Sequence, residues 1–280
     1  MTPPKPKPKV RKPAARRSAK TPARKPGSVM TGAPVPIFAW PPDEDRVEAI
    51  FARLSRVMPE PKTELRFQDP YTLVVAVALS AQATDVSVNK ATDILFAVAD
   101  TPEAMLALGE EDLIPFIASI GLYRNKAKNV IALSRIIVEQ HGGITPLNRA
   151  DLQALPGVGR KTASVVLNEL GIEPAIAVDT HVFRVSHRLG LANASTADKV
   201  EDQLHAVVPE AFLAKAHHWL ILHGRYTCTA RKPNCAGCVI SDLCPSRGLM
   251  AASEEAAQTA SSRARTASAK SKPRSGASDR

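Results

Sequence analysis

The stretch with the clearest chemical potential is a short glycine-containing turn, residues 155–161, which reads Leu-Pro-Gly-Val-Gly-Arg-Lys. Gly157 and Gly159 permit positive φ and carry no Cβ, so the backbone N–H groups around Val158 can point at one anion. A helix after the turn would add its unpaired N-terminal amides and the positive end of its dipole. Glycine pairs also close helix corners that bind nothing, but Pro156 and the two final cations favour a phosphate-binding hairpin.

Two side chains near the turn suggest catalysis in addition to binding. Arg160 and Lys161 end the stretch, and Asp179 lies further along the chain in the motif Val-Asp-Thr-His. A lysine amine beside a bound sugar-phosphate backbone can act as a nucleophile, and an aspartate can transfer protons or stabilise positive charge on the sugar. Asp179 can also be the N-cap of a helix that begins at Thr180, and this role is compatible with catalysis.

The four cysteines of the chain form one local group. They are Cys228, Cys235, Cys238 and Cys244, separated by six, two and five residues. Two disulfides are one alternative, but disulfides are uncommon in reducing compartments and the sequence shows no secretory signal. Zinc commonly takes two separated Cys-x2-Cys pairs, whereas here one such pair is accompanied by single outlying ligands. The spacing favours a [4Fe-4S] cluster and leaves zinc as a competitor.

Several further motifs follow one another in a fixed order between residues 45 and 246. They are Leu79-Ser80-Ala81-Gln82-Ala83-Thr84-Asp85, Ile120-Gly121-Leu122-Tyr123, Lys161-Thr162-Ala163, the run from Val178 to Arg184, and the run from His217 to Tyr226. Together with the cysteines, they resemble the endonuclease III family of helix-hairpin-helix DNA glycosylases and AP lyases. Agreement of separated motifs in the same order is far more specific than any one of them.

The resemblance implies a two-step reaction on damaged double-stranded DNA. Lys161 would attack C1′ of an extruded nucleotide, expel an oxidised pyrimidine and form an imine, and β-elimination would then cut the strand on the 3′ side. Asp179 would be its acid–base partner. Gln82 would face the orphaned partner base, and Leu122 would wedge between base steps. The alternatives are core packing for Leu122, which the sequence alone favours, and a loop hydrogen bond for Gln82.

Other residues are expected to hold the DNA or the cofactor. The remaining candidate DNA contacts are Gly157, Val158, Gly159, Arg160, Arg184, Arg231 and Lys232. The cluster is expected to be structural, because four thiolates would tie residues 225–246 into one loop and fix its cations near phosphates. His217, His218 and His223 are expected in the core or at the DNA, since four cysteines already complete the ligand set.

The formal net charge of +10 is carried by the two ends of the chain. Residues 1–42 contain ten Lys and Arg and no acid, and residues 247–280 contain seven against three. Residues 43–246 contain twenty against twenty-four, so this central part is net acidic. DNA must therefore be bound by local cationic patches, such as 124–128, 160–161 and 225–232, with acidic side chains on other faces.

The central part is expected to be all-α. Asp69-Pro70 before the apolar run 71–79 predicts a capped, buried helix, Thr101-Pro102 predicts the start of another, and apolar residues repeat at helical spacing in 130–138. The resemblance implies a two-lobed helix-hairpin-helix fold with the DNA cleft between the lobes.

The chain divides into five expected segments. Residues 1–42 are a Pro-rich basic tail and residues 247–280 an Ala/Ser/Arg-rich tail, and both are expected to be disordered. Residues 43–62 form an N-terminal helix that joins the cluster lobe. Residues 63–173 form a helical barrel that contains the hairpin, and residues 174–246 form the cluster lobe.

The sequence also bears on partners and location. The most apolar run, residues 71–81, is far shorter than the ~20 residues needed to cross a bilayer, so no membrane partner is expected. The N-terminus lacks the apolar segment of a signal peptide, and its prolines oppose an amphipathic transit helix. We expect a monomer in the bacterial cytoplasm, associated with the nucleoid, and leave a nuclear or organellar location open.

Two other functions stay open at this point. An adenine-mismatch DNA glycosylase shares the hairpin, the aspartate and the cysteines, but it does not use this lysine and carries a further C-terminal domain. A non-enzymatic helix-hairpin-helix DNA-binding protein would use the hairpin for phosphates alone, and the combination of Lys161 with Asp179 argues against it.

Overall fold

The computed structural model describes residues 38–249, and within that range all regular structure is helical. The expectation of an all-α fold is therefore confirmed. The expected disordered tails fall almost wholly outside the described residues. In chain order the elements are α1 (Glu44–Val57), α2 (Pro70–Ser80), α3 (Asp85–Leu95), α4 (Pro102–Ile117), α5 (Tyr123–His141), α6 (Arg149–Ala154), α7 (Arg160–Glu169), α8 (Thr180–Arg188), α9 (Ala197–Val207), α10 (Glu210–Tyr226) and the 3-10 helix η1 (Ser241–Leu243).

Several helices begin where a short polar side chain caps them. The Asp69 carboxylate accepts a hydrogen bond from the Thr72 backbone at 2.8 Å, and Pro70 occupies the first turn of α2. Thr101 caps α4 in the same way, through a 3.1 Å bond from the backbone N–H of Ala104. These caps satisfy amides that have no partner inside the helix, which fixes the starting points that the sequence predicted.

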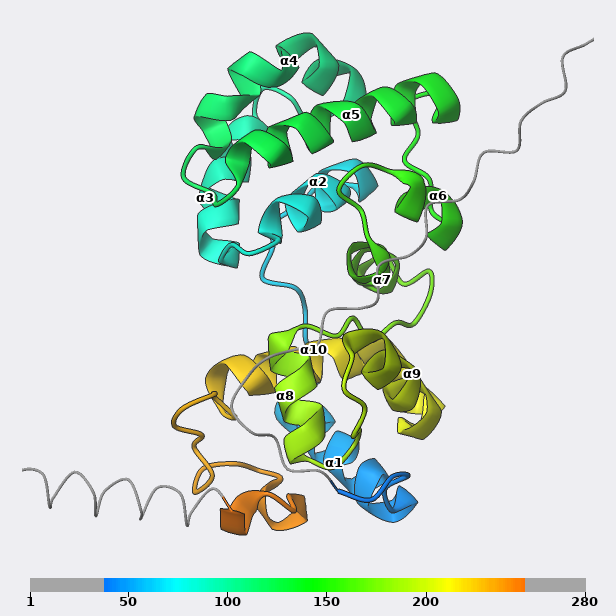
Figure 1. Cartoon of the computed structure of the whole chain (residues 1–280), viewed down its shortest axis with the longest axis vertical. Coiled ribbons are helices and arrows are strands. Elements are labelled where there is room, and N and C mark those ends of the chain that lie inside the picture. The colour runs from blue at the N-terminus through cyan, green and yellow to red at the C-terminus, as the bar shows by residue number, and fades with distance from the viewer. Residues whose placement is uncertain (1–37, 250–280) are drawn as a thin grey trace, which may run out of the picture.

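The first lobe is built around α2. Every residue of this helix from Tyr71 to Leu79 is buried, so α2 is the central helix of a core completed by α3, α4, α5 and α7. Burial on all sides explains why the helix tolerates three valines, since tertiary packing outweighs their weak helix propensity. Figure 1 shows α2 enclosed by α3, α4 and α5 on one side and by α7 on the other.

The second lobe combines the two ends of the described chain. The ring of Phe51 in α1 lies 6.0 Å from that of Phe212 and 6.3 Å from that of Trp219, both on α10. The indole N–H of Trp219 donates to the carbonyl of Met58 at 2.8 Å, which ties the end of α1 to α10. As a result α1 packs with α8, α9 and α10 in the lower lobe of Figure 1, far along the chain from its neighbours.

The first described residues already belong to this lobe. The carbonyl of Phe38 accepts a 3.2 Å hydrogen bond from the Asn193 side chain, and the Phe38 ring lies against Gly190. The sequence had placed residues 38–42 in the disordered N-terminal tail. These contacts show that Phe38, within that segment, packs on the folded second lobe.

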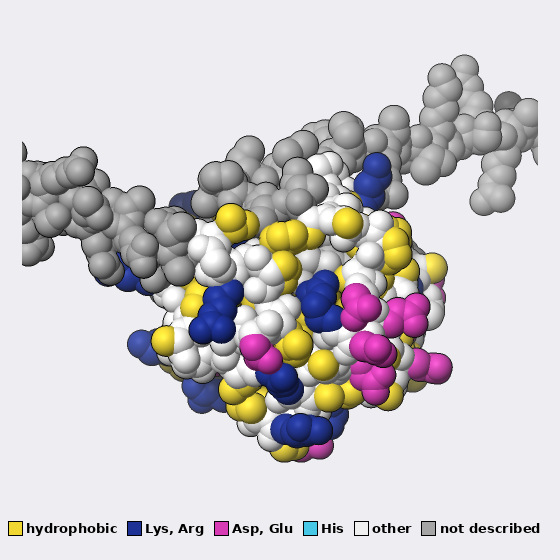
Figure 2. Space-filling view, turned by 90° about the horizontal axis from the view of Figure 1, so that it is seen from below, with side chains coloured by type: hydrophobic (Ala, Val, Ile, Leu, Met, Phe, Trp, Pro, Cys, Tyr) yellow, Lys and Arg dark blue, Asp and Glu magenta, His cyan; other side chains and the backbone are white. Residues whose placement is uncertain are grey.

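The surface of the described chain carries its charges in separate regions. Seen from below, as in Figure 2, Asp and Glu side chains gather on one side of the second lobe, while Lys and Arg side chains are spread over the rest of the face. This distribution agrees with a net acidic central chain whose cations act in local groups. No described helix is both long enough and apolar enough to cross a membrane.

Candidate functional site

A cavity of about 460 Å³ opens between the two lobes and contains the predicted reacting pair. Lys161, in the first turn of α7, enters it from the first lobe, and Asp179, just before α8, enters it from the second. Its other polar lining includes Gln82, His181 and His217. Because each lobe supplies one member of the pair, their separation depends on how the lobes are fixed to each other.

The hairpin that precedes α7 has the geometry of an anion site. Gly157 has φ +81°, which strains any residue with a side chain, and a Cβ at this position would also lie 3.1 Å from the Asn129 side chain. Gly159 differs from expectation, because its backbone is extended at φ −91° and a Cβ there would meet nothing within 4 Å. The protein itself therefore leaves the space above Gly159 open, which suits close approach of a ligand backbone.

The amino end of α7 is left without a cap of its own. Its N-cap, Gly159, offers no side-chain acceptor, and the first helical hydrogen bond runs from the Ala163 N–H to the Gly159 carbonyl at 3.0 Å. The amides of the first turn thus face outward, beside the exposed side chain of Lys161. A helix end of this kind attracts a phosphate through its N–H groups and its dipole.

Asp179 is held in place by its own helix. One carboxylate oxygen accepts a hydrogen bond from the Val182 backbone at 2.7 Å, which makes Asp179 the N-cap of α8 as the sequence predicted. The side chain is half-buried and still lines the cavity. The cap bond therefore fixes the orientation of a carboxylate that lines the cavity and involves only one of its two oxygens.

Gln82 and Leu122 occupy two loop tips of the first lobe, and both are exposed. They are the described non-glycine residues with a left-handed backbone, at φ +57° and φ +61°. Such a conformation costs roughly 1–2 kcal/mol and often marks a functional position. The Leu122 side chain is 59% exposed, so the core-packing alternative does not hold. A Cβ on Gly121 would lie 3.7 Å from the Gln82 carbonyl, which places the two loops side by side.

The expected DNA-binding cations have different surroundings. Arg160 pairs with Glu201 at 2.7 Å and with Asp202 at 2.8 Å, both on α9. Arg184 donates to the carbonyls of Gly224 and Cys228 at 2.8 and 3.1 Å. These two guanidinium groups thus have partners within the protein, and their contacts with DNA stay a prediction. Arg231 and Lys232 are exposed in the cysteine loop.

The four cysteines line one cavity and none of them is in a disulfide. Burial raises the pKa of the Cys238 and Cys244 thiols, so a buried thiolate set here needs positive charge to balance it. Arg188 donates to the Cys228 Sγ at 3.3 Å and to the Thr229 carbonyl at 2.7 Å, which fixes the start of the loop. Four thiols around one cavity, with no aspartate or glutamate among its lining residues, suit an iron–sulfur cluster.

His217, which the sequence placed in the core or at the DNA, is a buried residue that also lines the site. It is 96% buried on α10, it lines the cavity of Lys161 and Asp179, and its Nδ1 has no hydrogen-bond partner. Burial, together with the neighbouring His218, lowers the pKa of His217 to about 3. Its burial agrees with the expected core position, whereas nothing in the sequence indicates that His217 lines the cavity.

The buried neutral state of His217 predicts a pH-dependent stability. At pH values below 6.5, the ordinary pKa of histidine, His217 is protonated in the unfolded chain but stays neutral in the folded chain. The free energy of unfolding therefore falls as pH drops. This histidine alone should remove about 1.4 kcal/mol per pH unit in that range. We expect thermal melting at pH 7.5 and 5.5 to show a smaller pH-induced loss for His217→Gln than for the natural chain. His141→Gln is the control, and equal losses in all three proteins would contradict the prediction.

Comparisons with known protein families and sequences agree on one class of enzyme. Residues 75–210 match a family described as HhH-GPD superfamily base excision DNA repair protein, and residues 228–244 match the iron-sulfur binding domain of endonuclease III. The chain is 57% identical over 195 residues to endonuclease III of Escherichia coli (strain K12), a match that covers 70% of this chain and 92% of that protein. It is 54% identical over 199 residues to endonuclease III of Haemophilus influenzae, covering 71% and 94%.

Solved structures give the same picture. A non-covalent endonuclease III–DNA complex superposes with a TM-score of 0.70 and 40% identity, over 74% of this chain and 97% of that chain. A trapped endonuclease III–DNA covalent intermediate, an estranged-adenine complex, gives a TM-score of 0.70 and 40% identity over 74% and 98%. The match over the cysteine loop confirms the predicted iron–sulfur cofactor and removes zinc and disulfides as alternatives.

Proposed function

The chain belongs to the endonuclease III family of base excision repair DNA glycosylases and AP lyases, and we propose that it removes oxidised pyrimidines through an imine at Lys161. The observation that carries this proposal is the entry of Lys161 and Asp179, from opposite lobes, into one cavity. The solved structure of a trapped covalent intermediate of a relative supports the covalent route.

The first step is extrusion of the damaged nucleotide. C1′ is inaccessible inside a duplex, so the nucleotide must leave the stack before an amine can reach it. Gln82 and Leu122 stand exposed on adjacent loop tips, where a polar side chain can meet the orphaned partner base and an apolar one can enter the stack. The hairpin amides and the uncapped start of α7 hold the phosphate nearby.

The chemistry then runs through the lysine amine. Neutral Lys161 attacks C1′, the bond to the base breaks with its electron pair, and the sugar ring opens to an imine with the lysine nitrogen. The imine makes the C2′ proton acidic, and its removal breaks the C3′–O bond, which cuts the strand on the 3′ side of the lesion. Asp179 is suited to stabilise positive charge on the sugar and to move these protons, because its cap contact fixes its orientation.

The iron–sulfur cluster would be held by Cys228, Cys235, Cys238 and Cys244 and would act as a structural cross-link of their loop. It takes no part in the steps above. The exposed cations of that loop, Arg231 and Lys232, would then be presented to DNA phosphates from a fixed position.

Both reacting side chains come from a single chain, so we propose that a monomer acts on damaged double-stranded DNA. The relatives compared above are bacterial, which supports action in the bacterial cytoplasm at the nucleoid. An adenine-mismatch glycosylase or a non-enzymatic DNA-binding protein is disfavoured, because neither would use the exposed Lys161 that shares the interlobe cavity with Asp179.

Borohydride reduction during reaction with a thymine glycol duplex tests the proposal. Borohydride reduces an imine between protein and DNA to a stable amine, so we expect a covalent adduct on a denaturing gel. Without borohydride, we expect strand cleavage instead. A duplex without the lesion is the control. Release of the base without any adduct would indicate a water nucleophile and would overturn the lysine mechanism.

A further inference from the structure

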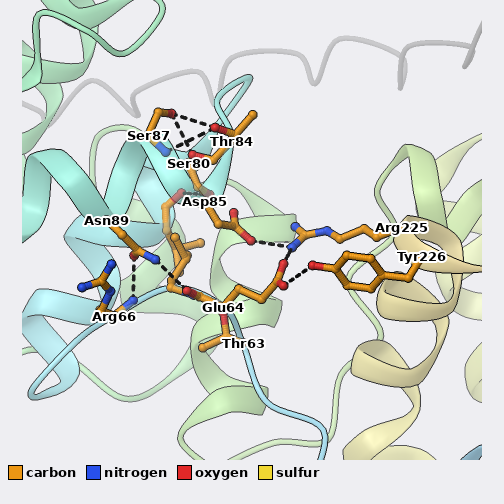
Figure 3. Close-up of polar contacts among 12 residues, drawn as sticks. Thr63, Glu64, Arg66, Ser80, Thr84, Asp85, Ser87, Asn89, Arg225 and Tyr226 are labelled. Atoms are coloured by element: carbon orange, nitrogen blue, oxygen red, sulfur yellow. Dashed lines mark hydrogen bonds and ion pairs between the residues drawn. The ribbon is translucent and has the colours of Figure 1, made fainter.

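Arg225, in the last turn of α10, joins three segments that are distant in the sequence. Its guanidinium nitrogen lies 2.6 Å from the Asp85 carboxylate at the start of α3, and it also pairs with Glu64 in the connection between α1 and α2. The neighbouring Tyr226 hydroxyl donates to the same Glu64 carboxylate. Figure 3 shows the α10 side chains reaching from one side toward Glu64 and Asp85 on the other.

This contact is partly shielded from water. The Asp85 side chain is 14% exposed and that of Arg225 is 26% exposed, so the ion pair has less solvent screening than an ordinary surface pair. Two carboxylates surround one guanidinium, and Arg225 therefore has no unbalanced positive charge to offer a phosphate. The sequence had counted Arg225 in a cationic patch for DNA, and the structure instead shows it engaged between the lobes.

The carboxylate that Arg225 contacts lies close in sequence to the Gln82 loop. Thr84 caps α3 and Asp85 is its first residue, so three positions separate the fixed carboxylate from Gln82 and its left-handed backbone. Arg225 and Asp85 also line both the reaction cavity and a second cavity of about 390 Å³. The pair thus forms part of the wall that supports the loop.

The opposite end of the contact is continuous with the cysteine loop. The backbone N–H groups of Thr227 and Cys228 both bond to the His223 carbonyl, at 3.0 and 2.7 Å, so the first cysteine follows directly from the helix end. Arg184 holds the carbonyls of Gly224 and Cys228 on either side of Arg225. The end of α10 is therefore a fixed point of the second lobe, from which Arg225 reaches across to the first.

We propose that Arg225 is a positioning residue that holds the Gln82 loop against the cluster lobe through Asp85, and so sets how well the gap left by an extruded nucleotide is filled. The inference rests on the proposed role of Gln82 in the gap. The new point is that the end of α10, from which the cysteine loop continues, also holds the Gln82 loop of the first lobe.

Loop order gives a test that is independent of catalysis. We expect hydrogen exchange at residues 81–84 to become at least about tenfold faster in Arg225→Gln and in Asp85→Asn, with no further change in the double variant, because both remove the same contact. Arg53→Gln is the matched control, since it removes an arginine–aspartate pair between α1 and η1 away from the loop. Unchanged exchange in Arg225→Gln, or full additivity in the double variant, would overturn the proposal.

The kinetic test compares two substrates under single-turnover conditions at saturating enzyme. Excision of thymine glycol requires unstacking of a base, whereas a preformed abasic site has no base to unstack. We expect Arg225→Gln to slow excision about tenfold and cleavage of the abasic site less than threefold, with partial rescue in Arg225→Lys and no change in Arg53→Gln. Equal slowing of both reactions would indicate a merely structural role and would overturn the inference.

Two further readouts separate this inference from the proposed chemistry. Absorbance near 400 nm must match the natural protein, so that cluster loss does not explain the result. Borohydride trapping on the abasic site must persist in Arg225→Gln. Failure to trap with the natural protein would defeat the lysine mechanism, whereas trapping with unchanged loop exchange would defeat only the role of Arg225.

Discussion

Lys161→Gln is expected to lose borohydride trapping and strand cleavage while it still binds damaged DNA. Glutamine is a polar side chain only one atom shorter than lysine, but it has no amine and cannot form an imine. The phosphate contacts of the hairpin come from backbone amides around Gly157 and Gly159, which the substitution leaves in place. We expect the single-turnover rate to fall on the order of 10⁴-fold and the dissociation constant to change by less than about threefold.

The measurements are trapping and cleavage on a thymine glycol duplex and on a preformed abasic site, beside a binding titration. Lys199→Gln is the matched control, because Lys199 is an exposed lysine on α9 outside the lining of the cavity. Undiminished trapping in Lys161→Gln would move the nucleophile to another amine. Loss of binding together with chemistry would mean that the lysine anchors DNA rather than reacts with it.

Local structure in this chain is predictable because the signals that determine it are local. Asp69 and Thr101 accept hydrogen bonds from amides of the helices that they precede, and Pro70 and Pro102 occupy the first turns, so the start of each helix can be located from a few residues. Asp179 obeys the same rule at α8. The hairpin is also local, although only Gly157 of its two glycines takes a positive φ.

The pairing of charges across the lobes was not predictable. Arg160 finds Glu201 and Arg225 finds Asp85 only after the chain has folded, and neither partner lies at a helical spacing that a sequence pattern could reveal. Both arginines looked like free cations beside DNA-binding motifs. Their partners are therefore the main feature of the site that sequence reasoning missed.

Leu122 illustrates the reverse error. A leucine in an apolar neighbourhood is most often a core residue, so the sequence alone favours packing. The backbone at Leu122 is left-handed and leaves the side chain 59% exposed at the tip of a loop. Neither composition nor periodicity reports the backbone conformation that accompanies this exposure.

Cys238→Ala is expected to yield protein without its cluster and with weakened DNA binding. Four thiolates are the full ligand complement, and no other thiol lines the cavity to replace the lost bond. Within residues 228–246, Ile240 is the single buried apolar side chain, so the loop has little core of its own to maintain its shape. Arg231 and Lys232 should then lose their fixed positions, with a loss of affinity of roughly tenfold, the scale of one or two phosphate contacts.

Iron and sulfide analysis, absorbance near 400 nm and a DNA titration at fixed salt measure these effects. Ser241→Ala is the matched control, because Ser241 lines the same cavity without being one of the four thiols. If Cys238→Ala is insoluble, chelation of iron from the natural protein tests the same point. The residual protein should still trap an abasic site once saturated with DNA, because Lys161 and Asp179 are held by α7 and α8 rather than by the loop. Soluble, iron-free protein with full DNA affinity would show that the cluster is not needed for DNA binding. Arg231 and Lys232 would then have to be held in position by something other than the cluster.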